Sequence, residues 1–568
     1  MMNEVAPEYD LAILGGGIAG LTLALEISKA RPKINILVVE RQKHPVPEAA
    51  HKVGESSMEI QAYYLRHVLG LGEHLQAQQL PKYGLRMFFS QGENRDITRR
   101  VEFGHAVRPP VQVATYQLDR GRLQNELGQQ LRQAHIAFWD DTKVQRVELL
   151  PEEEFHQVHL HSAEGNRTIQ ARWVVDASGR TMLLQRQLGL AKAVTHRANA
   201  VWFRLDYRVD IDHWSQDEGW HSRIREGQRW LSTNHLMGPG YWVWLIPLAS
   251  GSTSVGIVTD ATMHDFAEMN RFERALDWMR RHEPQCAAEI EAHQKSLQDF
   301  RVMKDYSYIC GQVFSDERWC LVGEAGFSLD PLYSPGGDLI AIGNGLASDL
   351  IIHALDGEDC EERAAIHNRL FDLLVTSWLG TYERQYPLMG NAQIMVAKII
   401  WDTAVYWAVP GLLYFHNLYR CIVDRPALIF GLARLSALSE HIQAFFRDWL
   451  ALNTSEDADT FIGYYDVDFM PRLHLGMTTS LADAALEQQY QRNIRLLEQL
   501  AGQLVSVVLD HVAHTLPDPA TQRQIRAWQG DPFLADLLAI YQQDSQTNPL
   551  DSGWITLGHQ LVFQEKAE

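Results

Sequence analysis

Cysteine is scarce in this chain of 568 residues, and the five that occur show neither CxxC spacing nor a metal-ligand pattern. Their scarcity excludes a disulfide-framework protein and favours reduced, mostly buried thiols in a cytosolic protein. The first ten residues, MMNEVAPEYD, are acidic and show no signal-peptide or transit-peptide pattern, so we expect a cytoplasmic location. The cysteines are Cys286, Cys310, Cys320, Cys360 and Cys421.

Positive charge is also in short supply. The 51 Lys and Arg residues are outnumbered by 71 Asp and Glu residues, which gives a net charge of −20. Because a nucleic-acid partner requires a basic surface, we exclude a nucleic-acid-binding function. The chain has no internal repeat or low-complexity linker. Its length allows two or three domains, and its 46% hydrophobic content predicts a large core.

Long hydrophobic runs are rare, and one needs interpretation. Residues 399–415 read IIWDTAVYWAVPGLLYF and are interrupted by Asp402, Pro410 and Gly411. The run is short for a membrane span, so we interpret it as a buried helix pair and expect no membrane contact. The alternative is a hydrophobic lid, or a surface that touches a membrane or an apolar substrate.

The start of the chain carries a nucleotide-binding pattern. A strand at residues 10–14 is followed by GGGIAG, a helix at residues 21–30 and a second strand at residues 34–39. Glu40 ends that second strand. The order of strand, GxGxxG, helix, strand and acid is that of a dinucleotide-binding βαβ unit, whereas an isolated glycine-rich turn would be weak evidence.

Each position of this pattern has a physical role. Gly15 permits the tight turn, and Gly17 lets a pyrophosphate approach the backbone. Gly20 allows the helix and the strand to pack closely, and Glu40 accepts hydrogen bonds from a ribose diol. The four residues predict a bound dinucleotide, but alone they fit NAD and FAD equally.

A later segment favours FAD. Residues 323–338 read GEAGFSLDPLYSPGGD, in which an acid closes a strand and a Pro/Gly-rich turn leads into an apolar helix at residues 339–352. Such a return segment places Glu324 on the flavin ribityl chain, and the helix N-terminus stabilises negative charge on the reduced ring. Because no second GxGxxG is visible for NAD(P)H, we expect a separate flavin reductase.

The order of predicted strands and helices indicates an α/β fold. We predict a Rossmann-like FAD-binding domain, an antiparallel substrate-side β-sheet and a helical C-terminal domain. The alternating segments VWFRLDYRV, YWVWLIPL and STSVGIV supply the sheet, and residues 265–298 are predicted to be helical. The predicted divisions are 1–190 (FAD-binding, first part), 191–300 (substrate-side sheet with helices), 301–378 (FAD-binding return) and 379–568 (helical domain).

An aromatic motif narrows the family. Residues 241–247 read YWVWLIP and contain W-x-W-x-I-P, and a strand-end turn, VVDASGR, precedes them at residues 174–180. The motif resembles the signature of flavin-dependent halogenases, and the turn is similar to one in flavoprotein monooxygenases. The resemblance implies that Trp242 and Trp244 lie near the flavin and discourage ordinary monooxygenation. The alternative is an aromatic strand in the core.

Two lysines belong to the same resemblance. The segment KVGES at residues 52–56 resembles the family's turn after the second strand and implies that Lys52 lies at the cofactor. In PKYG at residues 81–84, Lys82 matches the lysine of the phenol- and pyrrole-type branch, which guides hypohalous acid as a haloamine or by a hydrogen bond. The tryptophan-type branch has its lysine later, where this chain has none. The alternative for Lys82 is a solvated surface side chain.

The return segment resembles the halogenase pattern D-P-L-x-S-x-G. The chain departs from the family's pattern at Ser328 and Pro335. In the family, backbone N–H groups of this turn help to bind halide, and proline has no N–H. The paired Gly336 and Gly337 offer replacement donors. The matching residues are Asp330, Pro331, Leu332, Ser334 and Gly336.

The resemblance implies an FAD-dependent enzyme that uses reduced FAD and O2 to halogenate an electron-rich, hydrophobic aromatic, pyrrole or polyene group, free or carrier-bound. Alternatives are a non-halogenating flavin monooxygenase, a flavin oxidase or dehydrogenase, and a non-enzymatic flavin-binding protein. An aromatic C-terminal group, including Trp407, either lines a substrate tunnel or packs in the core. The predicted catalytic residues are Lys82, Trp242, Trp244, Asp330 and Ser334. The predicted cofactor-binding residues are Gly15, Gly17, Gly20, Glu40, Lys52, Glu324, Pro331, Gly336 and Gly337.

Overall fold

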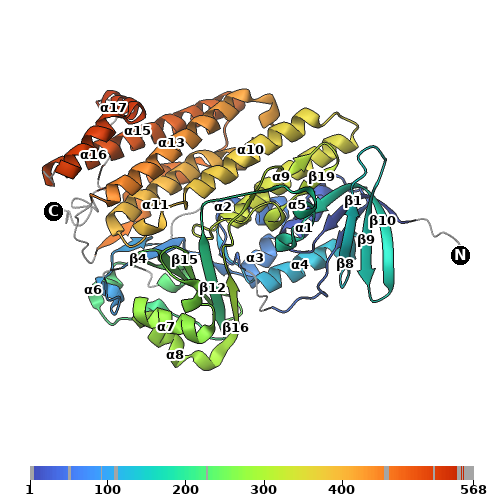
Figure 1. The fold of residues 1–568 in the computed structure, drawn as a ribbon, viewed down its shortest axis with the longest axis horizontal. Helices are drawn as coiled ribbons and strands as arrows, with labels where there is room; N and C mark the ends of the chain where they lie inside the picture. The colour runs from blue at the N-terminus through green and yellow to red at the C-terminus, as the bar shows by residue number, and fades with distance from the viewer. Residues whose placement is uncertain are drawn as a thin grey trace.

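Two β-sheets lie side by side beneath a layer of long C-terminal helices in the computed structural model (Figure 1). The fold is mixed α/β, as the sequence predicts. Four of the five cysteines are buried and none forms a disulfide, which confirms the expectation of buried thiols. The structure describes residues 6–48, 53–90, 92–107, 113–225, 228–452, 460–515, 519–546, 550, 552 and 554–555.

The first sheet is the core of the nucleotide-binding unit. Its strands run in the order β18-β19-β10-β1-β2-β7, and every pair from β19 to β7 is parallel. The four residues of β2, ILVV, are all buried, as expected for a parallel sheet covered on both faces. The strands are β1 (Glu8–Leu14), β2 (Ile36–Val39), β7 (Ala137–Trp139), β10 (Gly165–Asp176), β18 (Phe314–Ser315) and β19 (Trp319–Leu321).

Three helices connect this sheet to the rest of the molecule. Helix α1 (Ile18–Ala30) follows β1 and packs against α4 (Arg120–Gln133) and α9 (Pro335–Leu355). Helix α9 is long and apolar enough to cross a membrane, but 67% of its apolar window is buried inside the protein. Its surroundings are therefore those of a core helix.

The second sheet has the order β16-β12-β15-β14-β13-β4-β5-β20. The predicted antiparallel pairing is confirmed from β16 to β13, and helices α7 (Phe272–His282) and α8 (Pro284–Ala292) confirm the predicted helical stretch. The strands are β4 (Leu85–Phe89), β5 (Glu102–Gly104), β12 (Ala198–Leu205), β13 (Thr233–Gly238), β14 (Tyr241–Pro247), β15 (Thr253–Asp260), β16 (Leu297–Met303) and β20 (Phe461–Gly463).

The remaining strands make this sheet mixed rather than wholly antiparallel. Strand β4 pairs in parallel with β13, and β20 pairs in parallel with β5. Strands from the N-terminal and C-terminal regions thus extend the sheet at one edge. Local alternation of apolar and polar residues predicts that a segment is a strand, but it does not identify a distant partner.

The C-terminal region is helical, as predicted. Figure 1 shows α11, α13 and α15 above the second sheet, and α10 contacts β18 of the first sheet. The apolar run at residues 399–415 lies at the end of α11, in a π-helical turn (Trp407–Gly411) around Pro410, and in α12 (Leu412–Phe415). Most of the run is buried, which confirms a buried helical segment. The other helices are α10 (Glu361–Gly380), α11 (Ala392–Tyr406), α13 (Pro426–Leu450), α15 (Asp483–Thr515), α16 (Pro519–Gly530) and α17 (Pro532–Ser545).

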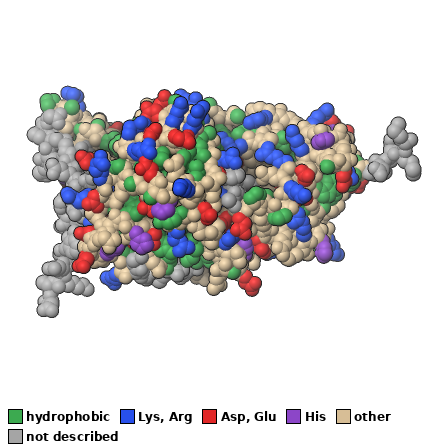
Figure 2. Space-filling view, turned by 90° about the horizontal axis from the view of Figure 1, so that it is seen from below, with side chains coloured by type: hydrophobic (Ala, Val, Ile, Leu, Met, Phe, Trp, Pro, Cys, Tyr) green, Lys and Arg blue, Asp and Glu red, His purple; other side chains and the backbone are tan. Residues whose placement is uncertain are grey.

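The surface carries both signs of charge despite the acidic composition. Figure 2 shows basic and acidic side chains interspersed over the face seen from below, with apolar side chains between them. Over the described residues of this face there is no continuous basic stripe. Binding of a polyanion finds no support on this face.

Candidate active site

A cavity of about 600 Å³ lies where the first sheet, the second sheet and α9 meet. Most of the predicted site residues line it, although they come from widely separated segments. Gly20 lies outside the lining, behind the glycine turn, and Lys52 lies outside the described residues. The lining includes Gly15, Gly17, Glu40, Trp242, Trp244, Glu324, Asp330, Pro331, Ser334, Gly336 and Gly337.

The glycine turn after β1 has the geometry that a bound pyrophosphate requires. Gly15 has a φ of +137°, and a Cβ there would overlap the carbonyl oxygen of Ala177. A Cβ on Gly20 would overlap the carbonyl oxygen of Gly15, so only glycine allows this close packing. A Cβ on Gly17 would meet nothing within 4 Å, which leaves the backbone open to the cavity. The turn therefore fits an approaching dinucleotide.

Glu40 lies at the end of β2 and is 7% exposed. Its two carboxylate oxygens accept hydrogen bonds from the N–H groups of Gly16 and Gln42, each at 2.7 Å. A carboxylate has about four acceptor sites, so capacity remains for a ribose diol. The backbone donors hold the carboxylate in place on the cavity wall.

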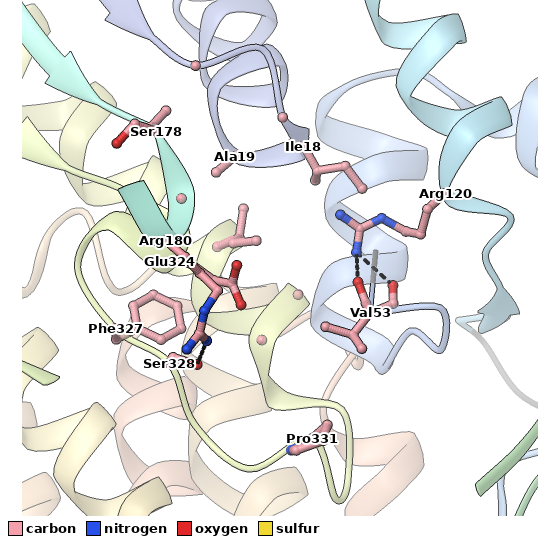
Figure 3. Close-up of a pocket in the computed structure, with 18 of the residues that line it drawn as sticks. Ile18, Ala19, Val53, Arg120, Ser178, Arg180, Glu324, Phe327, Ser328 and Pro331 are labelled. Atoms are coloured by element: carbon pink, nitrogen blue, oxygen red, sulfur yellow. Dashed lines mark hydrogen bonds between the residues drawn. The ribbon is translucent and has the colours of Figure 1, made fainter. Parts of the chain in front are cut away.

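Charged side chains stand on opposite sides of the cavity, as Figure 3 shows for Arg120 and Glu324. Arg120, at the start of α4, donates to the carbonyl oxygens of Val53 and Gly54 at 2.5 Å and 3.0 Å. Burial lowers the pKa of Arg120 to about 10, while Glu55 and Glu324 act in the opposite direction. A half-buried guanidinium beside a glycine turn suits the anionic part of a dinucleotide. Together with the glycine turn and the cavity volume, it makes this site fit FAD.

The turn before α9 positions its first N–H groups at the cavity. Tyr333 and Ser334 have φ values of 67° and 60°, and the Ser334 N–H donates to the carbonyl oxygen of Pro331 at 2.9 Å. Pro335 is the first residue of α9. Because first-turn N–H groups have no partner within a helix, Gly336 and Gly337 are the first available donors.

The two glycines differ sharply in their surroundings. A Cβ on Gly336 would meet nothing within 4 Å, whereas one on Gly337 would overlap the side-chain amide of Gln61. The backbone N–H of Gln61 donates to the Asp338 carboxylate at 2.9 Å, and the Tyr406 hydroxyl donates to the same carboxylate at 2.7 Å. Burial raises the pKa of Asp338 to about 7. The N-terminus of α9 is thereby fixed to the segment that contains Gln61.

Asp330 was predicted to be catalytic, but its carboxylate is already engaged. It is fully buried, and its Oδ2 accepts from the hydroxyls of Tyr306 and Tyr386 at 3.0 Å and 2.5 Å. The Nε2 of His196 lies 3.0 Å from the same oxygen. Three protein groups surround this oxygen and hold the carboxylate in place, while a direct catalytic role for Asp330 stays a prediction.

The positioning extends to the aromatic motif. The indole N–H of Trp242 donates to the Tyr386 hydroxyl at 3.1 Å, so Asp330 holds Trp242 through Tyr386. The indole N–H of Trp244 donates to Ser254 at 3.1 Å, and the two indole rings are 5.6 Å apart. Both tryptophans line the cavity, as the sequence predicts.

Lys82 lies in a second cavity, of about 50 Å³, rather than in the first. It is 7% exposed, and its Nζ donates to the carbonyl oxygen of Ser57 at 2.7 Å. Burial lowers the pKa of Lys82 to about 8, with Glu59 and Asp338 acting in the opposite direction. The alternative of a solvated surface lysine is therefore wrong.

One short segment separates the two cavities. Glu55, Ser56 and Gln61 line the first cavity, whereas Met58 and Glu59 line the second. C-terminal residues complete the second cavity, and they include Trp407 of the predicted aromatic group. The second cavity is lined by Met58, Glu59, Lys82, Gly84, Leu85, His105, Val113, Thr115, Thr403, Trp407, Tyr464 and His474.

Sequence reasoning missed several of these residues. Arg120 begins a helix with no motif around it, and Tyr386 and His474 come from distant C-terminal helices. Glu59 carried a local signal, because it follows the KVGES turn within the same short segment. The missed residues become neighbours only through packing between segments far apart in the chain.

Comparisons with known proteins agree with this geometry. The family described as "FAD binding domain" matches residues 8–326. The flavin-dependent halogenase chlA of Dictyostelium discoideum is 24% identical over 452 residues, which cover 74% of this chain and 73% of that protein. The 1H-pyrrole-2-carbonyl-(peptidyl-carrier protein) chlorinase of Pseudomonas fluorescens is 26% identical over 376 residues, which cover 63% and 79%.

A solved structure is similar over almost the whole length. The halogenase PltM in complex with phloroglucinol and FAD has a TM-score of 0.62 and 17% identity, and the match covers 96% of this chain and 98% of that one. At this identity the likeness shows the fold. The predicted resemblance to flavin-dependent halogenases is confirmed by these relatives.

Proposed function

Because the chain belongs to the FAD-binding domain family and FAD is its cofactor, we propose that it is a flavin-dependent halogenase of electron-rich arenes. One observation carries the proposal. The flavin-sized cavity, lined by Trp242 and Trp244, adjoins a second cavity that contains a buried lysine, Lys82. Halogenase relatives that span most of this chain support the same reaction.

The chain's own residues would hold FAD along the first cavity. The glycine turn and Arg120 face its pyrophosphate, Glu40 its ribose, and Glu324 its ribityl chain. Reduced FAD, when bound, would supply with O2 the oxidising equivalent that converts halide into hypohalous acid. The N–H groups of Gly336 and Gly337 would bind the halide at the N-terminus of α9.

Lys82 would receive the oxidant in the second cavity. With a pKa of about 8, its amine is partly neutral near physiological pH. The neutral amine can form a haloamine, and the ammonium can instead orient hypohalous acid by a hydrogen bond. In either case a C–X bond forms on the arene as the bond to halogen in the oxidant breaks. From hypohalous acid, the ring proton and the released hydroxide leave as water; from the haloamine, water has left when the N–X bond formed, and the ring proton returns to the Lys82 amine.

Several finer features belong to the same proposal. The relatives named as acting on carrier-bound pyrroles support a carrier-bound substrate for this chain. A separate reductase would deliver reduced FAD, and the location would be cytoplasmic. The domain division stays at 1–190, 191–300, 301–378 and 379–568, with strands β4, β5 and β20 lying in the second sheet.

The test is an assay with reductase-supplied reduced FAD, O2, bromide and a panel of free and carrier-bound phenols and pyrroles. We expect brominated products by mass spectrometry. Lys82→Met should lose the product while keeping FAD binding and oxidation of reduced FAD. Lys192→Met, which changes an exposed lysine paired with Asp372, is the matched control and should behave like the wild type.

Non-halogenating oxygenation is the second candidate, and Pro335 is the observation that favours it. The first position of α9 offers no N–H to a halide. If reduced FAD is consumed and the panel yields hydroxylated rather than brominated products, the halogenase proposal falls and this candidate replaces it.

A further inference from the structure

Glu59 has an unusual position in the second cavity. It begins the short helix α2 (Glu59–Tyr63) and is 8% exposed. Its Oε1 lies 3.3 Å from Nε2 of His474. Its Oε2 is buried and has no hydrogen-bond partner among the described residues. A buried carboxylate oxygen without a donor is rare and points to a group that is supplied from elsewhere.

The C-terminal region holds the partner of Glu59 firmly. His474 lies in α14 (Phe469–Gly476), and its Nδ1 is hydrogen-bonded to the hydroxyl of Tyr465. Its ring stacks on Trp407 with centroids 4.3 Å apart and planes 10° apart. Since the hydrogen bond and the stacking fix the imidazole, Glu59 is presented to the cavity in one orientation.

Glu59 is an acceptor rather than a donor at neutral pH. Burial opposes its ionisation, but the hydrogen bond and charge interaction with His474, together with Lys82, outweigh burial and lower the pKa of the Glu59 carboxyl. An ionised carboxylate has only acceptor sites. A ligand that satisfies Oε2 must therefore bring an O–H or N–H group.

The walls of the cavity favour a flat ligand. Trp407 forms one wall, and Tyr464 stacks on His105 with centroids 4.9 Å apart. Burial lowers the pKa of His105 to about 3, so this ring is neutral and adds no charge. The volume of about 50 Å³ is several times what one water needs, which is about 10–15 Å³. A cavity that binds benzene measures about 150 Å³, so a single ring enters only if the walls part, and a fused ring system or a polyene would need still more room.

We propose that Glu59 is a catalytic residue that selects single-ring arenes carrying an O–H or N–H group, which its Oε2 accepts as a hydrogen bond. The inference rests on the proposed halogenase function. While the ring carbon takes the halogen, Glu59 draws the O–H or N–H proton and raises electron density in the ring. The C–X bond forms as the bond to halogen in the oxidant breaks, and the ring C–H proton leaves with hydroxide as water when the oxidant is hypohalous acid, or on the Lys82 amine when it is the haloamine. Glu59 then returns the proton that it shared.

The test compares 3-methoxyphenol with 1,3-dimethoxybenzene, in which a methyl group replaces the hydroxyl hydrogen and removes the donor. Dissociation constants are measured by calorimetry on the oxidised FAD-loaded protein, where no turnover occurs. We expect the wild type to prefer the phenol by roughly ten- to hundredfold, the range for a hydrogen bond to a charged group. Glu59→Gln should remove most of this preference, and Glu73→Gln, at an exposed position of α3 (Gly72–Gln78), should leave it intact.

An unchanged preference in Glu59→Gln, with FAD binding retained, would overturn the inference. If that variant fails to bind FAD, Glu59→Asp replaces it, because it keeps the charge but withdraws the carboxylate by one methylene; the same loss of preference is expected. Binding and halogenation are scored separately. A donor preference that depends on Glu59, without any brominated product, supports the site and counts against the halogenase proposal alone.

Discussion

Restoring a backbone donor at the start of α9 should strengthen halide binding. Pro335 occupies the first helical position, between the cavity-lining Ser334 and Gly336, where its ring removes one N–H of the first turn. Replacing it by alanine adds one N–H next to those of Gly336 and Gly337 and changes little else. We therefore expect Pro335→Ala to lower the chloride concentration needed for half-maximal halogenation.

The expected change in chloride KM follows from the strength of one hydrogen bond to an anion. A hydrogen bond to a charged group contributes about 1.5–3 kcal/mol, and each 1.4 kcal/mol is a tenfold change in affinity. The chloride KM should therefore fall by roughly ten- to hundredfold. Loss of the proline ring costs about 0.4–1 kcal/mol of stability, because the unfolded chain gains freedom. That loss lowers the melting temperature slightly and leaves halide affinity unaffected.

The assay measures halogenated product at several chloride concentrations, with FAD affinity recorded in parallel. Pro532→Ala is the matched control, since Pro532 begins the remote helix α17 in the same way. It should show the small loss of stability without any change in chloride KM. An unchanged chloride KM in Pro335→Ala, at unchanged FAD affinity, would refute the idea that the missing N–H limits halide binding.

Three further predictions address other parts of the site. Halogenation per reduced FAD consumed should rise between pH 7 and pH 9, because the neutral form of Lys82 grows through its pKa of about 8; a fall over this range would indicate that the ammonium is the active form. Gly337→Ala should lower stability by about 1–3 kcal/mol in a thermal melt, because its Cβ displaces the buried Gln61 amide. Gly336→Ala should leave the thermal melt unchanged, because its Cβ meets no neighbour, and should weaken FAD binding in a fluorescence titration. Tyr386→Phe should cost about 1–3 kcal/mol in denaturant unfolding and raise peroxide release, because the Trp242 indole N–H loses its partner; unaltered unfolding would show that the Asp330 network holds nothing in place.

The parts of the site that the sequence predicts are those with short-range signals. The βαβ unit and the turn before α9 depend on glycine and proline chemistry within a few residues, so Gly15, Gly17 and Gly336 lie on the cavity as expected. The same holds for Trp242 and Trp244, because alternation along one strand places both on one face.

The remainder depends on contacts between distant segments. The burial of Lys82 results from strands and helices that close over it, and a lysine's surroundings leave no local pattern. Glu59 and His474 come from opposite ends of the chain and meet only after the C-terminal helices dock. The hydrogen bonds of the Asp330 carboxylate likewise depend on Tyr386, which lies in no recognisable motif.

The position of β20 and α14 has a consequence for the order in which the protein matures. The lining of the flavin cavity ends at Ile340, although Tyr386 and Tyr406 hold part of it in place. The lining of the Lys82 cavity extends to Trp407, Tyr464 and His474. Until these later residues are made, the edge of β5 is uncovered and the Lys82 cavity has no far wall. In the proposed chemistry, a partly made chain could bind flavin yet could not confine an oxidant. The C-terminal segment is thus the last part of the chain to close the Lys82 cavity. Cutting the chain before β20 should yield a flavoprotein that releases its oxidising equivalents into solution.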